Sequence, residues 1–216
     1  MRRKNSIRLK GYDYSEPGAY FVTICAKNRS CMFGDIADGV MRLSESGKIV
    51  ERCWQEIPEH FENTTVGEFQ VMPNHVHGVI QIIERMCRGE VASPRSPKGD
   101  ETSPLRKPTL GDVVAYFKYQ ATKHINEITQ TPGGKVFQRN YHDHIIRDDI
   151  DHFFVQQYIE LNPLLWYLDT DNPDIHRISI DDLRKTLHEK HNLNGFVLER
   201  MIEHELGYRD RSNVSE

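Results

Sequence analysis

The stretch VMPNHVHGVIQ, residues 71–81, places two histidines at alternating positions where two apolar segments meet. The segments 65–72 and 75–83 are rich in apolar and β-branched residues and predict two strands, joined tightly through MPN. Side chains of a strand alternate between its two faces, so His75 and His77 point to one face and the valine between them to the other. Two neighbouring imidazoles can supply two ligands of a metal ion. The other interpretation is a pair of sheet histidines without a ligand, and this pattern alone leaves both open.

The segments on either side extend this hairpin into a mixed pattern of strands and helices. Aromatic and β-branched residues predict strands, helical spacing of apolar residues predicts helices, and prolines and glycines mark the breaks. In chain order we expect a strand at 18–27, a helix at 43–57 that Pro58 closes, strands at 65–72 and 75–83, a helix at 109–128 capped by Thr109, a strand at 141–147 and a helix at 148–162. The first six elements match the ferredoxin-like split βαβ arrangement, an α+β fold with a central antiparallel sheet and helices on its faces.

The chain is long enough for one domain with a core of its own, which we place at residues 1–167. Within it, the proline-rich segment 84–108 predicts a mobile loop. Residues 168–216 are acidic and predict a small helical extension at the C-terminus.

Composition disfavours several classes of protein. No apolar run approaches the length of a membrane span, and the basic N-terminus lacks the apolar segment of a secretory signal. The four cysteines have no CxxC spacing, which disfavours a zinc knuckle or a disulfide framework and favours a reducing cytoplasm. Arg2, Arg3, Lys4 and Arg8 form a basic arm that suits a polyanionic partner, and the alternative is a solvated terminus.

The last predicted helix carries a second pair of polar residues. In QQYIELNPLLW, Tyr158 and Asn162 lie four residues apart and therefore share one helix face. Pro163 is expected to end or bend the helix, which leaves the Asn162 amide oxygen at a helix end as a hard metal ligand, one turn from the tyrosine hydroxyl. Taken singly, a core tyrosine and a helix C-terminal asparagine are the simpler interpretations.

Several segments together resemble one family. VMPNHVHGVI, followed further along the chain by YIELNPLLW, is similar to the REP-associated tyrosine transposases of the single-tyrosine HUH superfamily, in which HUH denotes His, a hydrophobic residue, His. The resemblance extends to RLKGYDYSEPGAYFVTICAKNR, GDVVAYFKYQATKHIN and FQRNYHDHIIRD, and it covers roughly residues 7–167.

The resemblance implies an enzyme that cleaves and rejoins DNA strands. It assigns His75, His77 and Asn162 to one divalent ion, Mg²⁺ or Mn²⁺, and Tyr158 to the nucleophile. The tyrosine would attack a phosphodiester of single-stranded, hairpin-forming DNA of the REP type, leaving a 5′-phosphotyrosine and a free 3′-hydroxyl. We expect a cytoplasmic, nucleoid-associated protein, for which a monomer is favoured and a dimer stays an open alternative.

Further basic and aromatic residues are candidate DNA contacts. They are Lys118 and Lys123 on the second long helix, Gln138 and Arg139 after it, the basic arm, and Tyr12 and Tyr14, which could stack on unpaired bases. For each helix residue a solvated face is the alternative. His142 and His144 are interpreted as strand residues near the DNA, because the first histidine pair already accounts for the ion.

Two other functions are consistent with these residues. A palindrome-binding protein that regulates DNA without cutting it would have no need of Tyr158. A metal-dependent phosphoesterase with water as its nucleophile would keep its activity when Tyr158 is replaced by Phe.

Overall fold

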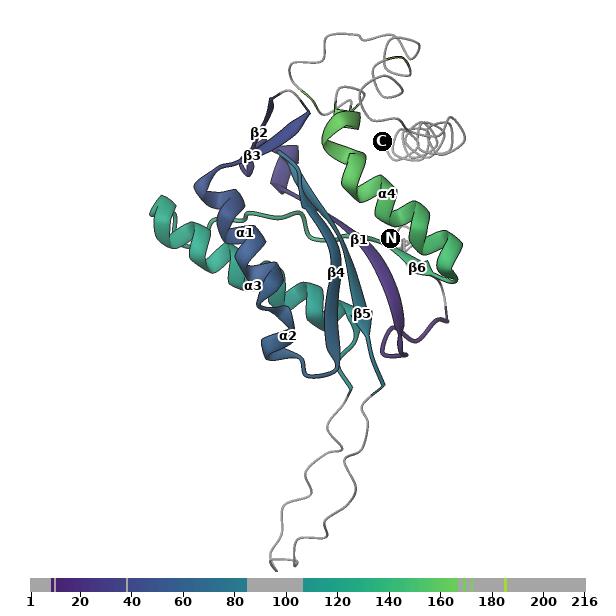
Figure 1. Ribbon diagram of the computed structural model, residues 1–216. Coiled ribbons are helices and arrows are strands. Elements are labelled where there is room, and N and C mark those ends of the chain that lie inside the picture. Colours follow the sequence, from purple (N-terminus) through teal and green to yellow (C-terminus); the bar gives the residue numbers. More distant parts are fainter. Residues whose placement is uncertain are drawn as a thin grey trace, which may run out of the picture.

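The central element of the structure is a four-stranded antiparallel sheet (Figure 1). The structure, a computed structural model, describes residues 9, 11–37, 39–84, 107–166, 169, 172 and 185. The strand order is β4 (Thr64–Val71), β5 (His75–Ile82), β1 (Gly18–Cys25) and β6 (His142–Ile146). Because β1 and β5 occupy the two central positions, this is the ferredoxin-like arrangement that the sequence predicts.

Helices cover both faces of the sheet, with α1 and α3 on one face and α4 on the other (Figure 1). Among the described residues, no helix is both long and apolar enough to cross a membrane. The remaining elements are α1 (Glu45–Gln55), α2 (Ile57–His60), α3 (Leu110–Thr129), α4 (Asp149–Leu165), the 3₁₀ turn η1 (Lys27–Arg29), and a separate hairpin of β2 (Gly34–Ala37) and β3 (Val40–Leu43).

Alternation along the central strands divides the apolar residues into two cores. Tyr20 and Val22 of β1 point into the larger core, together with buried residues of α1 and α3. Phe21 and Val79 point to the opposite face, where they pack with Ile159 of α4. The helix that carries the candidate nucleophile therefore lies on the odd-numbered face of β1 and β5, which is the face of the two histidines.

Gly78 lets a tryptophan lie directly on the sheet, one residue after the histidine pair. A Cβ atom at Gly78 would stand 2.3 Å from the ring of Trp54 in α1. That ring stacks on Phe69 of β4, with 4.5 Å between the ring centroids, and is almost completely buried. The indole thus fixes α1 against β4 and β5 from the side opposite to the histidines.

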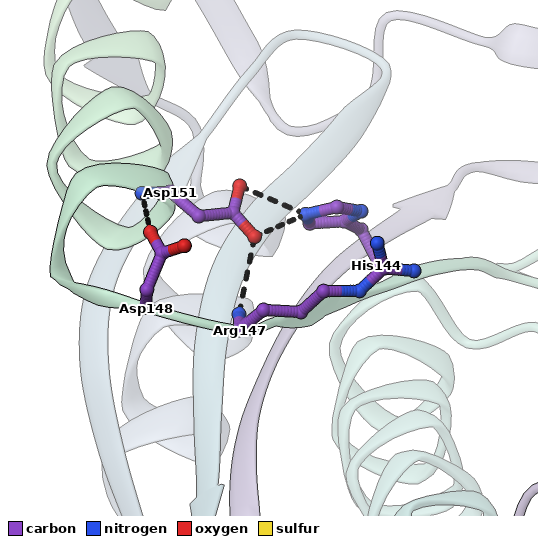
Figure 2. A network of polar contacts seen from close by, with 4 residues as sticks. All are labelled: His144, Arg147, Asp148 and Asp151. Carbon is purple, nitrogen blue, oxygen red and sulfur yellow. Dashed lines mark hydrogen bonds and ion pairs between the residues drawn. The ribbon is translucent and has the colours of Figure 1, made fainter.

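A small polar network ties the start of α4 to β6 (Figure 2). Asp148 caps the helix, because its carboxylate accepts a hydrogen bond of 2.8 Å from the backbone N–H of Asp151. The Asp151 carboxylate lies 2.9 Å from Nε2 of His144 and accepts from the backbone N–H of Arg147 at 3.2 Å. These contacts fix where α4 leaves the sheet and therefore which residues of α4 reach the histidine pair.

Two prolines that were expected to end helices lie inside helices. The helix expected over 43–57 is two helices, and Pro58 lies in the first turn of α2, where its missing N–H needs no partner. Pro163 neither ends α4 nor leaves Asn162 at its end, because the helix continues to Leu165. Residues of this last turn are buried, and their packing offsets the hydrogen bond that proline removes.

Other boundaries shift by a few residues, and one hairpin is new. β1 ends at Cys25, before the expected end at residue 27, and η1 follows at once. The β2–β3 hairpin was not expected, because its strands are only four residues long. The basic arm, most of the loop expected at 84–108 and nearly all of the extension at 168–216 lie outside the described residues and stay predictions.

Replacing Gly78 with Ala is expected to lower the free energy of unfolding by about 1–3 kcal/mol, because the added methyl overlaps the Trp54 ring. Chemical denaturation measures this. Gly18→Ala is the matched control, since its Cβ meets nothing closer than 3.6 Å and its stability should stay near that of the wild type. Equal stability of both variants would contradict the packing described here.

Candidate active site

The two histidines of β5 meet through their Nε2 atoms. These atoms are 2.8 Å apart, and both side chains are buried. Nδ1 of His75 lies 2.6 Å from the amide oxygen of Asn74, and Nδ1 of His77 lies 2.9 Å from the hydroxyl of Thr23. An amide oxygen can only accept, so the His75 proton is on Nδ1 and the Nε2 lone pair faces His77.

The partner of each Nδ1 atom prepares the other ring nitrogen to bind a cation. When Thr23 accepts from Nδ1 of His77, both Nε2 lone pairs point at one position and repel each other unless a positive charge lies between them. Metal-binding histidines in proteins are oriented by such a hydrogen bond from the second nitrogen. Burial lowers the pKa of His75 to about 3, and the charge of Arg29 acts in the same direction. His75 is therefore neutral near pH 7, as metal binding requires.

One face of α4 covers the histidine pair. The Tyr158 ring contacts His77, with 5.1 Å between centroids, and the Trp166 ring lies 6.3 Å from that of His75. Asn162 is midway between these two along the helix, four residues from each, and only 5% exposed. The Asn162 side chain therefore faces the sheet at the level of the two histidines. The structure brings His75, His77, Tyr158 and Asn162 together within one chain.

The residues of this site fit a hard divalent ion. Among the described residues, no group of three or more His, Cys, Asp or Glu side chains could hold a metal. A third ligand beside His75 and His77 would therefore be of another type, and the buried Asn162 amide is the expected one. Neutral imidazole and amide ligands leave the charge of the ion uncompensated, which suits a site for phosphate.

Four neighbours of the site were missed by the sequence analysis. Phe21 stacks on His77 with 5.4 Å between the ring centroids and also contacts the Tyr158 ring. The Trp166 ring contacts His75 at the other end of the histidine pair. Asn74 directly precedes the first histidine, and that adjacency could have identified it. Thr23 depends on the β1–β5 register, in which it pairs with His77, and no local pattern reveals this.

The candidate DNA contacts fall into different environments. The Lys118 ammonium donates to the backbone carbonyls of Gln138 and Arg139, and burial lowers its pKa. Lys118 thus holds the segment that leads to β6, in addition to any contact with DNA. The side chains of Lys123 and Arg139 are exposed and that of Gln138 is half-buried. Arg2, Arg3, Lys4 and Arg8 lie outside the described residues.

The two tyrosines near the N-terminus are part of the fold. Tyr14 is buried, and its hydroxyl donates to the carboxylate of Asp143 at 2.6 Å. Its ring is thus unavailable to stack on a base, which corrects the expectation from the sequence. Tyr12 is half-buried and packs edge-on against Tyr14, with 5.1 Å between centroids. His142 and His144 lie on β6, as expected.

Two proteins of known sequence are similar to this chain. No model of a protein family matches it. An uncharacterized protein of Haemophilus influenzae is 38% identical over 170 residues, which cover 78% of this chain and 93% of that protein. A protein of the same organism described as a "Putative REP-associated tyrosine transposase" is 24% identical over 160 residues, covering 70% of this chain and 73% of that protein.

The chain is thus similar in sequence to a protein described as a REP-associated tyrosine transposase. Among solved structures, that of a REP-associated tyrosine transposase bound to a REP hairpin matches 73% of this chain and 72% of that chain, with a TM-score of 0.48 and 16% identity.

Replacing Thr23 with Val is expected to weaken Mn²⁺ binding by about 10- to 100-fold, because His77 loses the partner that orients it. Isothermal titration of the purified protein measures the affinity. Thr65→Val on β4 is the control, because that hydroxyl is exposed and donates to Gln81, away from the histidines. An unchanged affinity in Thr23→Val would contradict the orienting role.

Proposed function

We propose that this protein is a metal-dependent transposase that cleaves and rejoins single-stranded, hairpin-forming DNA, with Tyr158 as its nucleophile. The observation that carries the proposal is the contact of the Tyr158 ring with His77, whose Nε2 atom converges with that of His75. A tyrosine beside a two-histidine site can supply both a nucleophile and ligands for a metal ion, which suits strand transfer. The named relative supports the same class of reaction.

The chemical step exchanges one phosphodiester for another. The Tyr158 oxygen attacks phosphorus and loses its proton, the bond between phosphorus and the 3′-oxygen breaks, and that oxygen leaves as a 3′-hydroxyl. The product is a 5′-phosphotyrosine, and attack by a 3′-hydroxyl reverses the step. Because the number of phosphodiester bonds is unchanged, the cycle needs no nucleotide hydrolysis.

The protein contributes the orientation of the nucleophile. The Tyr158 ring lies edge-on to Phe21 at 5.9 Å and contacts His77 at 5.1 Å, so the sheet surface fixes the ring plane. A tyrosine hydroxyl has an ordinary pKa of about 10 and is a poor nucleophile near pH 7. Holding it at the phosphorus removes part of the entropic barrier.

A divalent ion, Mg²⁺ or Mn²⁺, is part of the proposal. His75, His77 and Asn162 would hold it, and the neutral ligands and open positions suit these ions better than a closed structural zinc site. When bound, the ion supplies positive charge to the phosphate oxygens.

The proposed substrate and assembly follow from the family and from the site. The named relative is described as REP-associated, which supports palindromic repeats folded as hairpins as the substrate of this chain. The connection from β6, which ends at Ile146, to α4, which begins at Asp149, is short and supports a Tyr158 that serves the histidines of its own chain. We therefore propose that the protein acts as a monomer in which Tyr158 serves its own histidine pair.

Replacing Tyr158 with Phe is expected to abolish the covalent adduct between protein and DNA while sparing hairpin binding. The ring keeps its packing against Phe21 and His77, and only the nucleophilic oxygen is lost. The measurement is a denaturing gel with a labelled hairpin oligonucleotide from the repeats flanking the gene, with Mn²⁺ or with EDTA. Tyr119→Phe is the control, because Tyr119 is 65% exposed on α3 and lies outside the site.

Two outcomes would overturn the proposal. Cleavage that survives in Tyr158→Phe and forms no adduct in the wild type would indicate a phosphoesterase that uses water. Hairpin binding without cleavage, with both metals and several hairpins, would indicate a regulatory DNA-binding protein.

A further inference from the structure

The hairpin of β2 and β3 contacts both halves of the candidate active site. At its base, the backbone N–H of Phe33, directly before β2, donates to the carbonyl of Pro73 at 3.0 Å. Pro73 lies in the tight connection between β4 and β5, directly before the hydrogen-bonding partner of the first histidine. At the other end, the hairpin lies beside the C-terminal end of α4 (Figure 1). It therefore connects the segment that carries the histidine pair with the last turn of the helix that carries Tyr158 and Asn162.

The base of this hairpin is held in place from several sides. Phe33 is completely buried, and the centroid of its ring lies 5.6 Å from that of Phe137. The Phe33 carbonyl accepts a hydrogen bond of 2.9 Å from the backbone N–H of Ser44, the residue that caps α1. From this base the two strands run as a regular antiparallel ladder up to the pair Ala37 and Val40. The ladder therefore fixes where the tip of the hairpin lies.

The tip of the hairpin rests directly on α4. The pair Ala37 and Val40 leaves a loop of two residues, a length that favours glycine in a left-handed conformation. Gly39 has that conformation, with φ 75°. A Cβ atom at Gly39 would lie 2.3 Å from Cδ2 of Leu164, so any side chain there displaces Leu164. The backbone of the tip is therefore in contact with a methyl group in the last turn of α4.

The last turn of α4 depends on such contacts more than a regular helix turn does. Pro163 has no N–H, so the hydrogen bond that position 163 would donate to the carbonyl of Ile159 is missing. Asn162, directly before the proline, is buried. Leu164, directly after the proline, is the residue that the hairpin contacts. The hairpin thus supports the helix turn that presents the expected third ligand of the ion.

We propose that the β2–β3 hairpin sets the distance between the Asn162 amide and the histidine pair, and that Gly39 is the positioning residue at its tip. The distance between a hard divalent ion and an oxygen ligand varies only between about 2.0 and 2.6 Å. A displaced last turn therefore weakens the bond to the amide oxygen while both imidazoles keep their places. This inference rests on the proposed function, since it concerns the proposed ion ligand Asn162.

The first test measures the Mn²⁺ affinity of Gly39→Ala by isothermal titration, with Gly133→Ala as the matched control. Both glycines have a left-handed backbone, with φ 75° and 77°, so the two variants carry the same backbone strain. A Cβ atom at Gly133 meets nothing within 4 Å, whereas the added methyl of Gly39→Ala pushes Leu164. The affinity should fall by about 10-fold in Gly39→Ala and stay that of the wild type in Gly133→Ala. Equal affinity of Gly39→Ala and the wild type would overturn the inference.

A second test separates positioning of the ligand from general damage to the fold. It uses Co²⁺, which nitrogen ligands bind more tightly than Mn²⁺, so that variants without Asn162 can be titrated. In Asn162→Ala, adding Gly39→Ala should cause no further loss of affinity, because the ligand that the hairpin positions is absent. A further loss of about 10-fold, the size expected for a disturbed histidine partner, would show that the tip acts on the histidines and would overturn the inference.

Leu164→Ala removes the contact without adding a clash, and it covers the case in which Gly39→Ala does not fold. It should weaken Mn²⁺ binding by itself. Adding Gly39→Ala to it should cost little more, because the added methyl then has room. Unchanged affinity in Leu164→Ala would contradict the supporting contact.

The outcomes separate this inference from the proposed function. If Tyr158 forms the adduct and Gly39→Ala binds Mn²⁺ as tightly as the wild type, only the role of the hairpin is wrong. If the affinities change as expected but the wild type forms no adduct, the positioning role holds and the proposed reaction is wrong. A wild type that binds neither ion would overturn both.

Discussion

The register of β1 against β5 is the constraint on which the rest of the structure depends. It pairs Thr23 with His77 and Cys25 with His75, so both imidazoles share a face with Phe21. A slip by one residue would turn both histidines into the larger core and expose apolar side chains beneath α4. The register is held from the other face by Trp54, which occupies the space that a side chain at residue 78 would fill.

On this sheet, packing and polar contacts hold α4, which carries the other half of the site, in one position. Its first turn is clamped to β6 through Asp151 and His144, and His152 contacts Glu68 of β4 at 3.2 Å. Between these contacts and Trp166, every fourth residue faces the histidine pair. The result is a buried polar group of imidazoles and amides in an otherwise apolar interior, which is costly unless each nitrogen is oriented and used.

Sequence patterns predicted the parts of this arrangement that depend on local periodicity. Alternation in HVH placed both histidines on one face, and the spacing of Tyr158 and Asn162 placed them on one helix face, as found. The contacts of Thr23 and Asn74 with the histidines and the carbonyls that hold Lys118 were not predicted, because no local periodicity reveals them. The expectation that Pro163 ends the helix was wrong for a related reason. The burial of the last turn of α4 outweighs the local helix-breaking preference of proline.

The central claim is that the sheet and α4 assemble one site in which Tyr158 becomes joined to DNA. The most direct measurement is peptide mapping by mass spectrometry after incubation of the wild-type protein with hairpin DNA and Mn²⁺, followed by nuclease and protease digestion. The account predicts a nucleotide attached through its 5′-phosphate to Tyr158, and to no other tyrosine. A nucleotide on a different residue, or cleaved DNA with every tyrosine unmodified, would contradict it.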